Sequence, residues 1–432
     1  FNRDGDFADA GETFSVPVPN GTNGTFNVPV SVPVSAKLNT LLGIRFRLTN
    51  DPAFSGLATG SANSGEVEDY VAIVLGDDYG DLPDTYGTSG PNAPSHTVSP
   101  ELTLGGCVDN EAGGQPEPMA GMMTGGDDNT SDGTTIGTCA VGSDDENGIV
   151  FETPLLPGVE ACIRVTATNT TGAPAFLQAW IDFNGDGDLL DGGEALSLTG
   201  GGLIPNGGVN NQQFCFTVPA GATFQGGQAM VRFRLSSTGG LAPNNGAAAN
   251  GEIEDYKVAL AKIGTFVWED TNGDGIQNEP GTSGINGASV QLVWAGPDNN
   301  LATNGDNITF ATTTSTMGGF AGQYMFLGLT PGTYRVGLPA NPAGGFLPTA
   351  TNQGGDDQLD SDLAAGETFV VPVNFNMPLN EDGVGDVPGG TNGFPDVQDN
   401  LTFDFGYYEP ASISNYTWID DNGNGIQDQD ED

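Results

Sequence analysis

The chain has 432 residues, with 56 Asp or Glu against 10 Lys or Arg, and a formal net charge of −46 at pH 7. So acidic a composition argues against binding to nucleic acid or to anionic lipid, because both need clustered basic side chains. No apolar run approaches the roughly 20 residues that span a bilayer, and the length indicates about two to four domains.

Turn-forming residues are abundant, with 68 Gly and 28 Pro, and the segments between the turns are rich in Val, Thr, Ile and Phe at alternating positions. Such alternation is typical of half-buried strands. The stretch "MVRFRL" places Val231, Phe233 and Leu235 on one face and Arg232 and Arg234 on the other. No window has a sustained helical period of apolar residues. We therefore predict an all-β chain.

A first kind of unit occurs twice. Its opening stands at 1–12 ("FNRDGDFADAGE") and 183–194 ("FNGDGDLLDGGE"), and its closing motif at 65–70 ("GEVEDY") and 251–256 ("GEIEDY"). Repetition of this kind marks separate structural modules. We interpret residues 1–75 as the later part of a unit that residues 76–261 contain whole.

A second kind of unit opens with "GTFVWEDTNGDGIQ" at 264–277, and this opening recurs as "SNYTWIDDNGNGIQ" at 414–427. We predict one domain over 262–411 and the start of a further domain over 412–432. The chain is thus expected to begin inside one domain and to end inside another, so that the parent protein is longer.

The stretch "WIDFNGDGD" at 180–188 crowds acidic side chains into one loop. Neighbouring carboxylates repel each other unless a cation or a set of donors lies between them. We predict that this loop binds calcium through Asp182, Asn184, Asp186, Asp188, Asp191 and Glu194, and that the repeat does so through Asn2, Asp4, Asp6, Asp9 and Glu12. The alternative is a solvated acidic turn, in which Asp and Asn cap tight turns.

The loop at 420–431 fits the twelve-residue pattern of a calcium loop. Gly425 takes the position of the sharp turn. The ligand positions are filled by Asp420, Asn422, Asn424, the carbonyl of Ile426, Asp428 and Glu431. This loop is therefore predicted to bind Ca²⁺.

The loop at 270 departs from that pattern, because Gly281 stands at the final ligand position. A two-residue deletion relative to the twelve-residue pattern would move Asn278 and Glu279 into the final ligand positions. The predicted calcium ligands are Asp270, Asn272, Asp274, the carbonyl of Ile276, Asn278 and Glu279. Three further acidic residues are weaker candidates, namely Asp356, Asp360 and Asp362.

The four cysteines form no C-x-x-C pair, which argues against a zinc knuckle or a thioredoxin-type site. Their even number suggests two disulfides and an oxidising compartment. We favour Cys107 with Cys139 and Cys162 with Cys215. The two other pairings, and free buried thiols, stay open at this point.

Catalysis finds little support in the sequence. The only histidine, His96, lies between prolines in a predicted loop and is interpreted as a surface or capping residue. There is no G-x-S-x-G motif, so no enzymatic activity is expected. For Glu252, Glu254 and Asp255 we favour a structural network with the arginines of "MVRFRL" over a metal site or a solvated edge strand.

Several of these motifs resemble known families. The "GEVEDY" motif, "DYGDLPDTYG" at 78–87, "SDDENGIVF" at 143–151 and "AWIDFNGDGD" resemble the GEVED domain of bacterial secreted and surface proteins. The motifs "VWEDTNGDGIQ", "GQYMFLGLTPGTYRV" at 322–336, "DSDL" at 360–363 and "DFGYY" at 404–408 resemble the B-type domain of serine-aspartate repeat adhesins. The second resemblance implies a calcium-stabilised β-sandwich related to the collagen-adhesin B domain. Together they imply tandem β-sandwich modules, immunoglobulin-like or jelly-roll-like.

These observations predict a structural role outside the cell. We expect a calcium-stiffened stalk, adhesin or filament component on a bacterial surface, which self-associates end to end or binds a host or matrix protein or a glycan. The alternative is a carbohydrate- or protein-binding region of a larger secreted enzyme.

Overall fold

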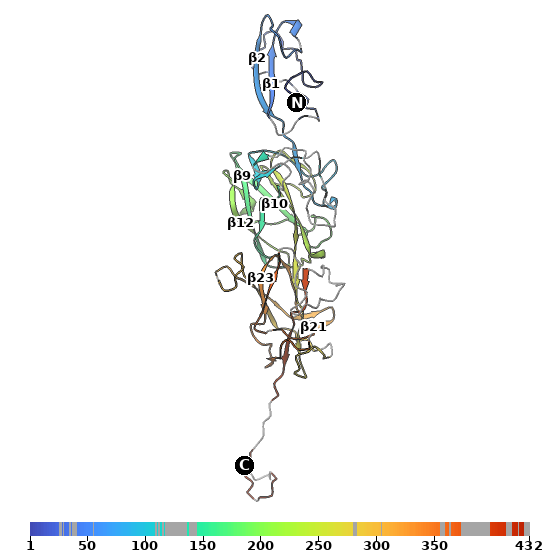
Figure 1. The fold of residues 1–432 in the computed structure, drawn as a ribbon, viewed down its shortest axis with the longest axis vertical. Coiled ribbons are helices and arrows are strands. Elements are labelled where there is room, and N and C mark those ends of the chain that lie inside the picture. The colour runs from blue at the N-terminus through green and yellow to red at the C-terminus, as the bar shows by residue number, and fades with distance from the viewer. Residues whose placement is uncertain are drawn as a thin grey trace. The chain divides into compact units, whose positions relative to one another are not determined.

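The structure, a computed structural model, divides into two compact units, residues 1–260 and 261–432 (Figure 1). It describes residues 1–25, 28, 30–33, 36, 41–54, 56–108, 110, 113–114, 116, 136–137, 145–279, 283–303, 305–354, 359–362, 364–372, 398–411, 417–421 and 423–426, without the side chains of 136–137. The division of the chain into four segments, made from the repeats, stays a prediction.

Residues 77–259 form strands that alternate apolar and polar side chains. In chain order these are β3 (Asp77–Tyr79), β4 (Ser95–Thr97), β5 (Leu102–Leu104), β6 (Cys107–Val108), β7 (Ile136–Gly137), β8 (Ile149–Phe151), β9 (Glu160–Asn169), β10 (Ala175–Ile181), β11 (Leu203–Ile204), β12 (Val209–Thr217), β13 (Gln228–Ser236), β14 (Ala247–Ala248) and β15 (Glu252–Ala259). Short 3₁₀ turns in the described part of the first unit are η1 (Pro52–Phe54), η2 (Asp84–Tyr86), η4 (Thr199–Gly202) and η5 (Gln225–Gly227).

Two four-stranded sheets pack face to face in this region. One has the order β11-β10-β13-β15, and the other has β12-β9-β5 with β8 also paired to β9. Phe151 of the second sheet contacts Phe233 and Tyr256 of the first, at ring-centroid distances of 6.4 and 6.2 Å. Aromatic packing between two inner faces is what closes a β-sandwich.

The central strand β13 differs from the sequence prediction. The alternation of "MVRFRL" predicted one buried face and one solvent face, but Arg232 and Arg234 are as buried as Phe233, with none of their surface exposed. The arginine face is covered because segments distant in the sequence supply its hydrogen-bond partners. A single strand's pattern carries no information about those segments.

Residues 41–73 repeat part of this arrangement. Strands β1 (Leu41–Leu48) and β2 (Glu66–Ile73) form an antiparallel pair in which Arg45 lies opposite Asp69. The pair β13–β15 has the same register, with Arg232 opposite Asp255. The repeat detected in the sequence is therefore also a repeat of strand pairing.

The second unit is also all β. Its strands are β16 (Ala261–Ile263), β17 (Val267–Glu269), β18 (Ser289–Trp294), β19 (Ile308–Thr313), β20 (Ser315–Met317), β21 (Phe320–Gln323), β22 (Phe326–Leu329), β23 (Gly332–Gly337), β24 (Leu347–Pro348), β25 (Glu367–Val371), β26 (Asp399–Asn400) and β27 (Phe405–Tyr408). The first strands pair in parallel with the last, β16 with β26 and β17 with β27.

The core of the second unit joins its sheets through aromatic side chains. The sheet β19-β18-β23-β25 carries Tyr334 and Phe369, whose rings stack at 5.5 Å, and Phe369 packs on Phe403 just before β27 at 4.9 Å. Trp268 and Phe405 are fully buried. The prediction of an all-β chain of tandem β-sandwich modules is confirmed.

Among the residues that the structure describes, no helix combines the length and apolarity needed to cross a bilayer.

Candidate metal sites in the acidic loops

The backbone of the loop after β10 is held in tight turns by hydrogen bonds to the loop's own Asn and Asp side chains. The side-chain oxygen of Asn184 accepts the N–H of Asp186 (2.9 Å), that of Asp186 accepts the N–H of Asp188 (3.2 Å), and that of Asp188 accepts the N–H of Leu190 (2.8 Å). Asn and Asp favour such turns because a short side chain can bond the backbone two residues on. Their spacing therefore determines the local fold before any cation is considered.

Asp182 lies at the inner end of this loop and is 1% exposed. Its Oδ1 accepts the N–H of Gly185 (2.6 Å), and its Oδ2 accepts the N–H of Gly187 (3.1 Å) and the hydroxyl proton of Tyr86 (2.7 Å). Gly187 has a φ of 94°, a conformation that glycine adopts readily. The glycine thus lets the backbone turn its N–H groups toward the carboxylate.

The structure brings the predicted ligands of this loop together. Carboxylate oxygens of Asp182, Asp186 and Glu194 lie within 4.8 Å of one another, and so do those of Asp186, Asp188 and Asp191. Asn184 donates from Nδ2 to Asp186 (3.1 Å) and to Asp191 (2.7 Å). The carboxylates of Asp186 and Asp191 therefore share one amide donor, as the solvated-turn interpretation expects.

The inner group has a different environment. Glu194 is 3% exposed; its Oε2 accepts the N–H of Asp191 (2.9 Å), whereas its buried Oε1 has no hydrogen-bond partner within the described part of the chain. Burial, together with the charges of Asp182, Asp186 and Asp191, raises the pKa of Glu194 to about 7. A buried carboxylate oxygen without a donor, beside other carboxylates, fits the oxygen ligand set of a calcium ion.

The loop at 1–12 reproduces the turns of the loop after β10, although Glu12 accepts at Oε1 from the chain's N-terminal ammonium (2.6 Å). Asn2 accepts the N–H of Asp4 (3.1 Å), and Asp4 accepts the N–H of Asp6 (3.1 Å). Asn2 also donates from Nδ2 to Asp9. Oxygens of Asp4, Asp6 and Glu12 lie within 4.8 Å of one another, and the buried Oε2 of Glu12 has no partner among the described residues.

The loop at 270 begins in the same way. Asp270 accepts the N–H of Gly273 at Oδ1 (2.6 Å), and at Oδ2 it accepts the N–H of Gly275 (2.8 Å) and the hydroxyl proton of Thr349. Asp270 is fully buried. The hydrogen bonds from Thr349 and from the backbone N–H groups lower its pKa and outweigh the opposing effect of burial.

The end of this loop is closed by the residues that the two-residue deletion predicted. Asn278 donates to Asp274 (2.8 Å) and accepts from Asn272 (3.0 Å), while the carbonyl of Ile276 accepts the N–H of Asn278 (2.8 Å). Glu279 accepts the N–H of Thr271 at Oε1 (3.1 Å).

The closing glutamate again has an unpaired oxygen. The Oε2 of Glu279 is buried without a hydrogen-bond partner among the described residues, and burial raises the pKa of this carboxyl, with a smaller contribution from Asp270. Within the described residues, no three carboxylates of this loop approach within 4.8 Å of one another. Its ligand set is thus less closely gathered than that of the loop at 182.

The loop at 420 is described only in its first turn. Asp420 accepts the N–H groups of Gly423 (2.6 Å) and Gly425 (2.7 Å), and Asn424 accepts the N–H of Ile426 (2.7 Å). Asp270 makes the matching contacts with Gly273 and Gly275. The other predicted ligands, Asn422, Asp428 and Glu431, lie outside the described residues, and so does Asp356.

Asp360 and Asp362 lie beside the loop at 270. Asp360 forms a β-bridge with Ile276, and Asp362 accepts the N–H of Asp404 (2.6 Å). Burial raises the pKa of Asp404 to about 7. The role of Asp360 and Asp362 as calcium ligands stays a prediction.

The "GEIEDY" motif forms a buried network with β13, as favoured from the sequence. Arg232 donates to both oxygens of Asp255 (2.7 and 2.6 Å), and Asp255 also accepts the N–H groups of Asp81 and Leu82 (2.9 Å each). Glu252 and Glu254, however, face backbone N–H groups rather than arginines, those of Leu104 and of Asn147 and Gly148.

The interpretation of His96 as a surface or capping residue is wrong. His96 belongs to β4 and is fully buried. Its Nε2 accepts the Nε–H of Arg234 (3.0 Å), and its Nδ1 lies 3.0 Å from the carbonyl of Asn250. The flanking prolines suggested a loop, but the three-residue strand between them is too short to show a sequence period.

One predicted disulfide is confirmed and one is undescribed. Cys162 of β9 is bonded to Cys215 of β12, with 4.0 Å between their Cα atoms. Cys107 is fully buried in β6, which pairs with β7. Cys139 lies outside the described residues, so its pairing with Cys107 stays a prediction.

Comparison with family models agrees with this architecture. Residues 1–73 and 176–259 match the GEVED domain, and residues 261–386 match the SdrD B-like domain. The chain contains GEVED and SdrD B-like domains. The GEVED model thus matches the chain twice, once at residues 1–73 and once at the later strands of the complete unit, residues 176–259.

Known relatives are similar over part of the chain. Serine-aspartate repeat-containing protein D of Staphylococcus aureus strain Newman is 33% identical over 202 residues, which are 46% of this chain and 12% of that protein. Serine-aspartate repeat-containing protein C of strain N315 is 34% identical over 190 residues, 44% of this chain and 15% of that protein. The chain therefore matches only a small part of the length of these relatives.

Solved structures resemble the chain weakly. The 35 kDa C-terminal fragment of the major pilin GBS80 of Streptococcus agalactiae is 11% identical, covers 59% of this chain and 95% of its own, and has a TM-score of 0.22. The full-length RrgB pilus protein of Streptococcus pneumoniae is 11% identical over 91% of this chain and 95% of its own, with a TM-score of 0.23. Such scores support no argument about fold or function.

Two contributors to these loops were missed by sequence reasoning. The hydroxyls of Tyr86 and Thr349 each donate to the first carboxylate of a loop from far away in the sequence. Tyr86 belongs to "DYGDLPDTYG", a motif used only for its family resemblance. No spacing rule could have connected it to Asp182.

Proposed function

We propose that this chain is part of an extracellular structural protein, a stalk, adhesin or filament component of a bacterial surface, whose acidic loops bind calcium. The GEVED and SdrD B-like domains and the similarity to serine-aspartate repeat proteins support the structural role. The observation that carries the calcium assignment is the closing glutamate of three loops. Glu12, Glu194 and Glu279 each keep one buried carboxylate oxygen without a donor among the described residues.

The physical argument is one of charge and desolvation. A buried carboxylate oxygen that lacks a donor is costly, and other carboxylates nearby increase this cost. A calcium ion would offset it, because calcium accepts six to eight oxygen ligands in a flexible geometry. The residues that would hold it best are Asp182, Asp186 and Glu194, whose oxygens are already gathered.

Calcium would also serve the mechanical role. A chain of net charge −46 repels itself, and a divalent ion in each loop would lower that charge while connecting strand ends. We propose that modules stiffened in this way assemble end to end into a fibre, and that the fibre or its tip binds a host or matrix protein or a glycan.

Thermal unfolding of the full chain tests the calcium assignment. In millimolar Ca²⁺ the melting temperature should lie several degrees above that in excess chelator, because a ligand that binds only the folded state adds its binding free energy to stability. Asp182→Asn should remove part of this shift. Equal melting temperatures in Ca²⁺ and in chelator at low salt would defeat the assignment.

The structural role needs a separate measurement. Negative-stain electron microscopy of the native parent protein should show extended, module-bearing strands. Compact particles of a single size would contradict the proposed fibre without bearing on calcium.

A further inference from the structure

In both units, a hydroxyl from a distant segment holds the first carboxylate of an acidic loop. Tyr86 donates to Asp182 across 96 residues of sequence, and Thr349 donates to Asp270 across 79. Both carboxylates are buried, and both receive the hydroxyl at Oδ2, beside a glycine N–H. Two different residue types thus make the same contact in two different domains.

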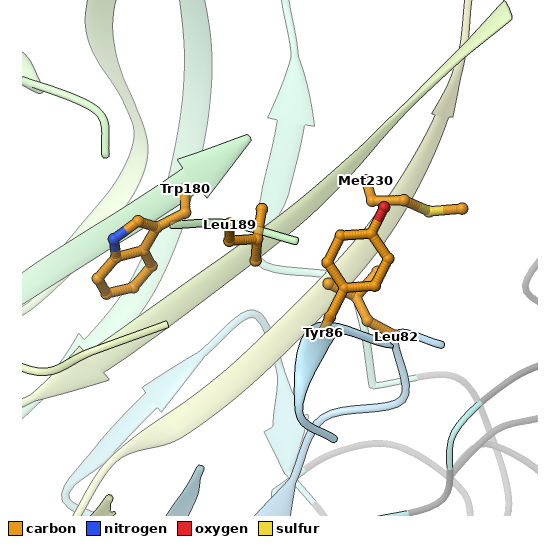
Figure 2. Close-up of a cluster of buried hydrophobic side chains, with 5 residues drawn as sticks. All are labelled: Leu82, Tyr86, Trp180, Leu189 and Met230. Atoms are coloured by element: carbon orange, nitrogen blue, oxygen red, sulfur yellow. The ribbon is translucent and has the colours of Figure 1, made fainter. Parts of the chain in front are cut away.

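Tyr86 is itself held firmly. Its ring packs in a buried cluster with Leu82, Trp180, Leu189 and Met230 (Figure 2). In this view Leu189, which directly follows Asp188 of the loop, lies between Trp180 and Tyr86. The tyrosine therefore shares one buried cluster with Leu189 of the loop, Trp180 of β10 and Met230 of β13, and it donates its hydroxyl proton to the start of the loop at Asp182.

The same residue also connects to the buried arginine network. The carbonyl of Tyr86 accepts the Nη1–H of Arg232 (3.2 Å), and the nearby Thr88 accepts from Nη2 of Arg232 (3.0 Å). Asp255, the partner of Arg232, accepts the N–H groups of Asp81 and Leu82. Residues 81–88 are thus attached to the sheet through Arg232 and Asp255 on one side and through Asp182 on the other.

We propose that Tyr86 and Thr349 are positioning residues that preorganise the first carboxylate of each loop for a cation, so that cation binding and attachment of their distant segments stabilise each other. This rests on the proposed calcium binding. A ligand carboxylate that already has its orientation fixed loses less conformational freedom when the ion binds, and hydrogen bonds to ligands commonly change metal affinity tenfold or more.

The coupling must be reciprocal. If the Tyr86 hydroxyl strengthens calcium binding at Asp182, then bound calcium strengthens the attachment of residues 81–88 by the same free energy. Loss of calcium would therefore loosen residues 81–88, which are distant from the loop in the sequence, and not only the loop itself. This distinguishes a coupled site from an isolated surface ion.

The test uses the full chain and Ca²⁺ as the only added ligand. The amide resonances of Gly187 and Gly275 report the two loops separately in an NMR titration after chelator is removed. We expect Tyr86→Phe, which keeps the ring, to weaken calcium binding at Gly187 about tenfold and to leave Gly275 unchanged. Thr349→Val should give the reverse pattern.

Tyr334→Phe is the matched control. Its buried hydroxyl donates to the carbonyl of Thr330 (2.7 Å) and not to a loop, so this variant should lose a comparable hydrogen bond while both calcium affinities stay at the wild-type value. Hydrogen exchange adds the reciprocal readout. Calcium should slow exchange at Tyr86 and Gly87 in the wild type, and less so in Tyr86→Phe.

The outcomes separate the two proposals. Calcium bound at both loops with wild-type affinity in Tyr86→Phe and Thr349→Val would overturn the positioning role and leave calcium binding standing. An absence of any calcium-induced shift at Gly187 and Gly275 in the wild type would overturn both. A general loss of affinity in all three variants, the control included, would reduce the effect to stability and also overturn the positioning role.

Discussion

Glu194 illustrates how a single residue can be costly without a ligand and useful with one. Its carboxyl is buried beside three aspartates, and its pKa is raised to about 7. A carboxyl with a raised folded pKa favours the folded state at low pH, and this contribution is lost as pH rises through the folded pKa. In the absence of calcium, ionised Glu194 is therefore destabilising at pH 8.

We predict that Glu194→Gln changes sign with calcium. In chelator at pH 8 the variant should melt at a higher temperature than the wild type, because an uncharged amide removes the repulsion and much of the desolvation cost. In calcium it should melt at a lower temperature, because a ligand is lost. A variant that is less stable than the wild type in both buffers would contradict the proposed site.

His96 has the opposite dependence on pH. Burial, and secondarily the charge of Arg234, lowers its pKa to about 3. Because Arg234 donates to Nε2, the ring proton lies on Nδ1 and donates to the carbonyl of Asn250. A histidine with a lowered folded pKa contributes stability that is present above its unfolded pKa of about 6.5 and is lost as pH falls.

His96→Gln should therefore flatten the acid side of the stability profile. Between pH 6.5 and pH 4.5 the wild type is expected to lose more unfolding free energy than the variant, although the variant is less stable at neutral pH. Chemical denaturation at a series of pH values measures both slopes. Parallel profiles would show that the imidazole is not kept neutral by the fold.

The arginine–aspartate pairs show the effect of environment at the scale of strands. Arg232–Asp255 and Arg45–Asp69 have the same bidentate geometry on equivalent strand pairs, with N–O distances of 2.6 to 2.7 Å. The side chains of the first pair are 0% exposed, whereas those of the second are 32% and 57% exposed. The two ion pairs therefore have the same hydrogen-bond geometry and differ in their burial.

Burial should decide the effect of replacing each arginine. Arg232→Lys cannot keep the two parallel hydrogen bonds and leaves Asp255 buried with an incomplete partner, at a cost of about 3 kcal/mol or more. Arg45→Lys, in the exposed pair, should change stability by no more than the error of measurement. Guanidinium unfolding of the two variants makes the comparison, and similar losses in both would refute the argument.

The sequence predicted the strands and loops better than it predicted which distant residues would contact them. Alternating residues located the strand "MVRFRL", and the sequence favoured a structural network between its arginines and the carboxylates of "GEIEDY". The burial of Arg234 was not predictable, because it depends on His96 and on carbonyls of the 242–246 segment. Likewise, spacing located the acidic loops, but the donors from Tyr86 and Thr349 arise only when distant segments meet.

At the scale of the whole molecule, the two GEVED repeats show what the earlier strands of the unit contribute. Phe46 is 48% exposed and its equivalent Phe233 is 0% exposed; Val67 is 52% exposed and its equivalent Ile253 is 2%. In the complete sandwich Phe233 packs against Phe151 of the second sheet, and β13 pairs with β10 along its other edge. Phe151 and β10 both belong to residues 76–182, for which residues 1–75 hold no counterpart.

This difference predicts the behaviour of a rearranged chain. Joining residues 76–182 directly ahead of residues 1–75 places Asp182 before Phe1, as it stands before Phe183, and so restores both the loop and the sheet. The rearranged domain should unfold cooperatively, protect the amides of β1 and β2 from exchange, and bind less of a hydrophobic dye than residues 1–75 alone. Burial of the apolar face drives all three changes. If the rearranged domain kept the dye binding of the short segment and melted without cooperativity, then the repeat in sequence would not be a repeat in fold.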